Sequence, residues 1–196
     1  MPRGPAKQFD PDEALDAAMT VFRARGYEAA GVTELLAAMG IGRKSLYDTF
    51  GSKRGLFLEA VRRYGAREAD ALEATLSAPG SPLANVRAAV EAVARAHGCA
   101  GAVGCGIGNS VADFTEADPE ASATLAALAE ANRERWAAAL RRARDAGELP
   151  PHADPDDLAR TLQCLTQGMA LLGRVSGPML AGAARGLTSL LGAPPD

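Results

Sequence analysis

Aromatic residues, cysteines and histidines are scarce in this chain, and their scarcity narrows its class. Aromatic residues make up 5% of 196 residues, and the remainder is rich in alanine, which favours helices over sheets. Cys99, Cys105 and Cys164 form no CxxC pair, and their odd number argues against a disulfide framework. The two histidines, His97 and His152, are too few for a zinc site. We therefore predict an all-α protein without structural disulfides or metal.

Signals for membranes, phosphate loops and catalysis are also lacking. No early apolar stretch reaches the length of a signal sequence or a membrane span, so we expect a cytoplasmic protein without membrane contact. Residues 98–108 are rich in glycine but contain neither G-x-G-x-x-G nor a Walker pattern, which excludes a phosphate-binding loop. No Ser-His-Asp or Cys-His arrangement has support from spacing. We predict neither an enzyme nor a bound cofactor.

Charge is divided unevenly along the chain, whose net charge is −3. Residues 1–67 carry 11 Lys and Arg against 8 Asp and Glu, whereas residues 68–196 carry 10 against 16. This asymmetry suits a basic, nucleic-acid-binding head on an acidic body, although a solvated face often carries a similar imbalance.

A short apolar segment, residues 32–39, is followed by two glycines and then by a polar segment. Gly40 is a fitting helix end because glycine adopts a left-handed backbone at little cost, and Gly42 can cap the next helix. Leu46 and Phe50 are four residues apart, so they share the face that packs inward. Two short helices, a tight turn and a polar outer face indicate a helix-turn-helix, which places its second helix in the DNA major groove.

The helix-turn-helix and its flanks carry a specific motif. It comprises Gly-Tyr-Glu-Ala at 26–29, Val-Thr-Glu-Leu-Leu-Ala-Ala-Met-Gly-Ile at 32–41, Ser-Leu-Tyr at 45–47, Phe-Gly-Ser-Lys at 50–53 and Leu-Phe at 56–57. In these positions the chain resembles the DNA-binding domain of the TetR family, whose members are dimeric, ligand-responsive bacterial transcription regulators. The resemblance implies a helix-turn-helix head at residues 1–51 and a helical ligand-binding and dimerisation body at residues 52–196. It implies three partners: an operator in double-stranded DNA, a small-molecule effector and a second copy of the chain.

The DNA contacts expected from this resemblance fall into two sets. The set expected on phosphates comprises Thr33, Tyr47 and Lys53, and the set expected in the groove comprises Gly42, Arg43, Lys44, Ser45 and Asp48. Arg43 and Lys44 can donate to guanine O6 and N7. Asp48 departs from the aromatic or neutral polar residue common in the family, so we expect it either to read a cytosine amino group or to face away from DNA.

The body is predicted to consist of further helices. A long helix is expected from Ser52 to about residue 76, followed by helices at about 83–97, 119–146, 155–174 and 178–191. The helix at 155–174 is apolar on more than one side, so it must be buried all round, most simply against a second copy. The resemblance implies a four-helix bundle formed by the last two helices of two subunits. Its expected contacts are Leu162, Leu165, Met169, Leu187 and Leu191.

A ligand cavity is expected within the body. Its predicted lining comprises Cys105, Ile107, Asn109, Trp136 and Gln163. Few charges fall on these faces, so we predict a repressor released by a small apolar or weakly polar effector. The roles of three of these residues remain open. Trp136 is suited either to core packing or to a ligand platform, and Asn109 either to satisfying a helix end or to contacting an effector. Cys105 is either part of the cavity wall or a sensor of oxidants and electrophiles.

In an alternative function, DNA binding by the head is weak or lost. The chain would then be a small-molecule-binding dimer, or a redox- and electrophile-sensing dimer acting through Cys105, with a weak or lost DNA-binding role. The basic pair Arg43 and Lys44 on the second helix argues against this alternative.

Overall fold

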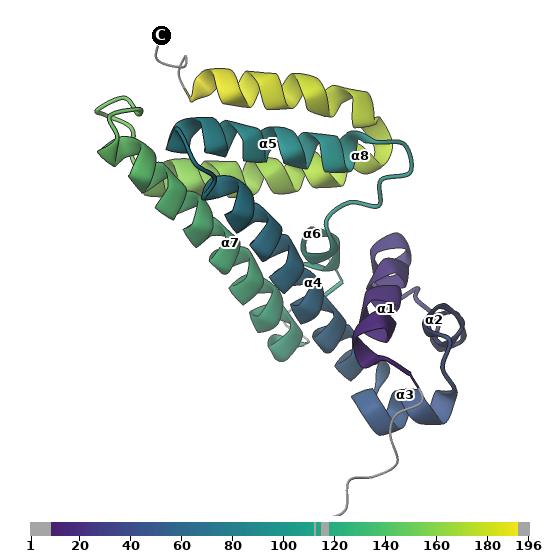
Figure 1. The fold of residues 1–196 in the computed structure, drawn as a ribbon. Helices are drawn as coiled ribbons and strands as arrows, with labels where there is room; N and C mark the ends of the chain where they lie inside the picture. Colours follow the sequence, from purple (N-terminus) through teal and green to yellow (C-terminus); the bar gives the residue numbers. More distant parts are fainter. Residues whose placement is uncertain (1–8, 112, 115–117, 192–196) are drawn as a thin grey trace, which may run out of the picture.

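A computed structural model of the protein describes residues 9–111, 113–114 and 118–191. Within these ranges every regular element is a helix, as predicted. The helices are α1 (Pro11–Arg25), α2 (Val32–Met39), α3 (Arg43–Phe50), α4 (Lys53–Leu76), α5 (Pro82–Gly98), α6 (Gly106–Val111), α7 (Pro119–Asp145) and α8 (Pro155–Leu190). Figure 1 shows α1–α3 gathered at one end of the long helix α4, α6 and α7 alongside α4, and α5 and α8 at its opposite end.

Local sequence signals account for the head. The Asp10 carboxylate accepts a hydrogen bond from the Asp12 N–H at 2.8 Å and so caps α1. Gly40 ends α2 with φ of 65°, a left-handed conformation that favours glycine. Leu46 and Phe50 of α3 are buried, as their spacing predicts, which leaves the polar side of α3 facing outward.

Two apolar cores meet along α4. The core around the head includes Phe22, Leu35 and Phe57, and it extends to Phe114 and to Leu125 of α7. The core of the body begins at the far end of α4 and includes Leu76, Leu83, Val90, Trp136, Leu140, Leu162 and Leu180. Because α4 contributes to both cores, it is the continuous element that joins the helix-turn-helix to the rest of the chain.

Helix α8 is bent where the sequence predicts a break between two helices. Ser176 has non-helical backbone angles, φ −148° and ψ 63°, and Pro178 follows two residues later. Figure 1 shows the second half of α8 turning back beside α5. The approach is close: a Cβ built on Gly173 would lie 2.2 Å from the His97 carbonyl oxygen, and one on Gly177 would lie 2.5 Å from that of Gly98. Glycine is therefore required where the bend of α8 crosses the end of α5.

Among the residues described, no helix combines the length and the apolar character that crossing a membrane would require.

Candidate nucleic-acid interface and ligand cavity

The outer face of α3 presents the residues that the sequence assigns to the DNA groove. Gly42, Arg43, Lys44 and Asp48 are exposed, and Ser45 is half-buried. Tyr47 is 43% exposed although it is a large aromatic residue. Since buried Leu46 and Phe50 hold the opposite face of α3, the polar side chains stand on a fixed support.

Lys44 and Asp48 form an ion pair one helical turn apart. Asp48 therefore turns toward Lys44 in the free protein, and each side chain neutralises the other's charge. Arg43 is exposed and has no ion-pair partner among the described residues, so it is the cation of α3 that is free to meet DNA. Among the charged residues of the groove set, Arg43 is thus the cation without an ion-pair partner in the described chain, and Lys44 and Asp48 pair with each other.

Lys53 and Thr33 flank α3. The Lys53 ammonium donates to the Glu28 carbonyl oxygen at 3.2 Å and lies 4.5 Å from the centre of the Tyr27 ring. An ammonium has three N–H donors, so this position holds the group in place and leaves donors for a phosphate oxygen. Thr33 is exposed in the first turn of α2, where helix N-termini favour phosphate.

Three polar contacts that the sequence did not predict hold the head and the first turn of α4 against the segments on either side of α6. The Arg23 guanidinium donates to the Gly104 carbonyl oxygen at 2.7 and 3.2 Å. The Tyr27 N–H donates to the Asp113 carboxylate at 2.7 Å. The Arg54 guanidinium makes two hydrogen bonds to Asp118, both 2.7 Å long. All three reach the segment that precedes α6 or joins α6 to α7. These partners are more than 60 positions apart in sequence, and no local pattern pairs them.

The Arg54–Asp118 contact gives a prediction for acid stability. Hydrogen bonds from Arg54, followed by the Ala121 N–H, lower the pKa of Asp118 from 3.8 to about 2. A carboxylate whose pKa is lowered by folding stabilises the fold above its ordinary pKa, and this stabilisation disappears as the pH falls from about 4 to about 2. The stability of Arg54→Met should therefore fall less than that of the wild type across this interval.

Urea unfolding at a series of pH values measures this difference. Arg62→Met is a suitable control, because the Arg62 guanidinium lies 3.7 Å from Glu120 and pairs with that carboxylate rather than with Asp118. The prediction would be contradicted if the free energies of unfolding of the wild type and Arg54→Met fell by the same amount as the pH decreased.

A partly open cavity of about 80 Å³, called the inner cavity below, lies between α4, α5, α6, α7 and α8. Its lining comprises Glu68, Leu72, Val93, His97, Cys105, Ile107, Asn132, Trp136, Gln163, Thr166, Gln167 and Ala170. Four of the residues that the sequence assigns to a ligand, namely Cys105, Ile107, Trp136 and Gln163, meet here. About half of the lining is polar, so the cavity is less apolar than the sequence predicts.

Asn109 lies outside this cavity. Its amide nitrogen donates to the carbonyl oxygens of Val103 at 2.6 Å and Arg23 at 3.3 Å, so it holds the segment before α6 against α1. Of the two roles left open by the sequence, the structure favours the structural one. Asn109 also borders an outer pocket of about 180 Å³, which shares Cys105 and Gln167 with the inner cavity.

The glycines of α6 serve close contacts. A Cβ built on Gly106 would lie 2.4 Å from the Met19 methyl group, and one on Gly108 would lie 2.5 Å from the Gln167 amide oxygen. Gly106 thus lets α6 lie close to Met19 of α1 and Tyr64 of α4. This packing places α6 between the cavity and the DNA-binding end.

His97 is a cavity residue that the sequence did not single out. It is 9% exposed at the end of α5. Burial, followed by the positive charge of Arg23, lowers the pKa of His97 below its ordinary 6.5, so the imidazole is neutral at pH 7. Its closeness to Cys99 and Cys105 in sequence is a weak signal of a shared site, and only Cys105 joins it in the cavity lining.

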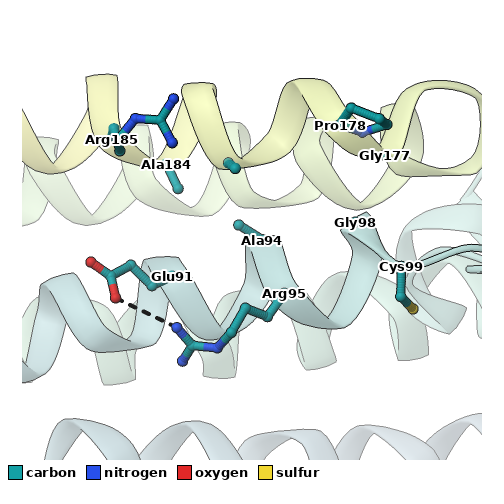
Figure 2. A pocket seen from close by; sticks show the side chains of 10 residues that line it. Glu91, Ala94, Arg95, Gly98, Cys99, Gly177, Pro178, Ala184 and Arg185 are labelled. Atoms are coloured by element: carbon teal, nitrogen blue, oxygen red, sulfur yellow. Dashed lines mark hydrogen bonds and ion pairs between the residues drawn. The ribbon is translucent and has the colours of Figure 1, made fainter.

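A larger groove of about 460 Å³ lies between α5 and the second half of α8. Figure 2 shows Ala94, Gly98 and Ala184 between the two helices, with Glu91 and Arg95 paired on α5. All of its lining residues come from α5, the residue that follows it, and α8. Because neither α4 nor α6 borders this groove, the smaller inner cavity is the better placed of the two to influence the head.

The apolar surface of α8 differs from the predicted dimer contacts. Of those five residues, Leu162, Met169, Leu187 and Leu191 are at most 7% exposed and belong to the chain's own core. Leu165 is 43% exposed. Other large apolar residues of α8 are exposed, namely Leu171, Leu172, Val175, Met179 and Leu190. Helix α8 thus has an uncovered apolar face, but it is composed mostly of residues other than those predicted.

The fold and these sites define a helix-turn-helix transcription regulator. Residues 14–60 match the family of bacterial regulatory proteins named tetR, and residues 82–184 match the tetracyclin repressor-like C-terminal domain. The second match alone spans more than half of the chain. The chain belongs to the TetR family, as the sequence motif predicts.

Similar proteins agree with this assignment. The chain is 34% identical over 178 residues to the uncharacterized HTH-type transcriptional regulator YezE of Bacillus subtilis (strain 168), covering 90% of this chain and 92% of that protein. It is 35% identical over 177 residues to the HTH-type transcriptional repressor ComR of Escherichia coli (strain K12), covering 88% of this chain and 83% of that protein. The TetR family regulator CifR was solved as a cysteine mutant with 26bp operator DNA. Its structure matches this one with a TM-score of 0.83 at 26% identity, covering 96% of this chain and 98% of that chain.

Proposed function

We propose that this protein is a cytoplasmic transcriptional repressor, without enzymatic activity, that binds an operator in double-stranded DNA as a homodimer. Residues 1–51 would act as the DNA-binding head, and residues 52–196 as the ligand-binding and dimerisation body. The observation that carries the proposal is the exposed face of α3, where Arg43 is a free cation, among the described residues, on a rigidly packed helix. Repression rather than activation is supported by ComR, a repressor similar over most of the chain. The activator FasR of Mycolicibacterium smegmatis aligns with 41% of it.

Phosphate contacts by Thr33, Tyr47 and Lys53 would supply affinity and register, and the outer face of α3 would supply sequence choice. Two heads related by a twofold axis require a near-palindromic operator, with half-sites about one helical turn, ~34–36 Å, or a multiple apart. The proposal is supported by CifR, whose structure was solved with operator DNA.

Release by a small-molecule effector is the second half of the proposal. The inner cavity is bordered by α4, whose first turns pack in the core of the head, and by α6, which packs against α1. A ligand that shifts either helix changes the spacing of the two heads. Effector and DNA must then weaken each other's binding by the same factor, typically about 5–150-fold. A redox-sensing dimer without a DNA function is not favoured, because the relatives similar over most of the chain are HTH-type regulators.

Arg43→Ala tests whether the exposed face of α3 recognises the DNA sequence. On an operator selected from random DNA, it should cost about 1–3 kcal/mol and relax sequence choice at one position in each half-site. Lys53→Ala is the matched control: it should weaken binding to all sequences about equally and reduce the salt slope by about one unit for each phosphate that Lys53 neutralises. Quantitative binding to the selected site and to single-base variants, at several salt concentrations, separates the two effects. Unchanged affinity and preference in Arg43→Ala would refute this orientation of α3.

A further inference from the structure

Two half-buried glutamines in the wall of the inner cavity each have one buried hydrogen-bonding atom that is not used among the described residues. The Gln163 side-chain nitrogen and the Gln167 side-chain oxygen are buried, and neither has a hydrogen-bond partner among the described residues. Both side chains line the cavity, and their spacing of four residues places them on one face of α8. Buried polar groups are nearly always paired, because leaving one unpaired is costly. Both atoms are therefore available to pair with a bound molecule.

The charges around these amides favour a neutral partner. The lining contains the Glu68 carboxylate and neither lysine nor arginine. The imidazole of His97 is uncharged at pH 7, because burial and Arg23 lower its pKa. Glu68 is an exposed residue of this lining, and the lining holds no cation that would balance an anion, whose burial without a partner costs far more than that of a neutral group.

The volume of the cavity restricts the size of that partner. About 80 Å³ corresponds to roughly three water molecules at about 30 Å³ each, well below the about 300–1,000 Å³ of pockets that hold drug-sized ligands. A molecule of a few non-hydrogen atoms fills this space. Ile107 and Trp136 supply apolar walls against which a short alkyl group can pack.

We propose that the inner cavity binds a small neutral molecule with a hydrogen-bond acceptor and a donor side by side, as in a short-chain primary amide. The Gln163 amide nitrogen donates to its acceptor, and the Gln167 amide oxygen accepts from its donor. Extended apolar compounds and carboxylates are excluded. The claim that this molecule is the effector rests on the proposed regulator function. The claim that it binds in the cavity does not.

Three compounds of nearly equal size test this chemistry. Propionamide offers a donor and an acceptor, 2-butanone offers an acceptor only, and propionate carries a negative charge. Trp136, the single tryptophan, lines the cavity and reports binding by fluorescence in the full-length protein. Propionamide should bind saturably and at least about tenfold more tightly than 2-butanone, since only propionamide pairs both amides. Propionate should bind more weakly than either.

Variants then assign the effect to the two amides. Gln163→Met and Gln167→Met keep the length and approximate volume of the side chain and remove the unpaired polar atoms. Each should abolish the preference for propionamide and raise the Tm of the unliganded protein by about 2–4 °C. Cys164→Ser is the control, because Cys164 is exposed on the same helix and does not line the cavity. It should change neither quantity.

The outcomes separate this inference from the proposed function. Propionamide binding that depends on both glutamines supports the inference, even when DNA affinity does not change; in that case release by the effector is the part that fails. Propionate binding as tight as propionamide, propionamide binding that survives both substitutions, or no saturable binding in a protein that still binds its selected operator each overturns the inference.

Discussion

Gly55→Ala is expected to destabilise the head and to abolish operator binding. A Cβ built on Gly55 would lie 2.1 Å from the Phe50 carbonyl oxygen and 3.5 Å from the Ser52 hydroxyl oxygen. The obstructing atom belongs to the backbone at the end of α3, so no side-chain rotation relieves the contact. The Gly55 N–H also takes part in the cap of α4, donating to the Ser52 hydroxyl at 2.9 Å. Alanine must therefore push α3 away from α4.

Overpacking of this kind typically costs about 1–3 kcal/mol, and displacement of the reading helix should remove specific DNA binding altogether. Urea unfolding and titration with the selected operator measure the two effects. Gly186→Ala is the matched control: Gly186 lies within α8 with no atom in the way, so alanine should stabilise the protein by about 0.5–1 kcal/mol. Wild-type stability and DNA affinity in Gly55→Ala would show that α3 does not approach α4 this closely.

The parts of the fold that follow from short-range signals could be predicted from the sequence. Gly40 and Ser52 mark helix ends because capping depends on a few neighbouring residues, and the structure confirms both of them. The helix-turn-helix is the densest set of such signals, which is why its motif identifies the family. The ion pair of Lys44 with Asp48 was not predicted from the sequence, although oppositely charged residues four apart on a helix are neighbours.

Features that depend on distant segments could not be predicted in the same way. The contact of Arg54 with Asp118 joins residues 64 positions apart, and the cavity gathers side chains from five helices. Periodicity shows that α8 is apolar on several sides, but it does not tell which side meets the chain's own core. That is why the sequence assigns Leu162 and Leu187 to a second copy although they are buried within one chain.

The uncovered face of α8 gives the last prediction. Leu165 and Leu172 are 43% and 47% exposed and seven residues apart, so they lie on one face of the helix. In the proposed dimer this face meets the second copy. The double variant Leu165→Glu, Leu172→Glu would place repelling carboxylates in the interface while leaving the core of each chain intact, so we expect a folded monomer.

A monomer binds one half-site at a time and forgoes the benefit of tethering two heads, which amounts to about 10²–10⁴ in affinity. Light scattering at micromolar concentration and titration of the full operator should therefore show halved mass and a weakening of this size, with helical circular dichroism retained. Leu187→Glu is the contrasting variant: Leu187 is 7% exposed within the chain's own core, so a charge there should unfold the protein instead of dissociating it. If the double variant remains a dimer, the two copies meet through another surface, and the exposed leucines of α8 need a different explanation.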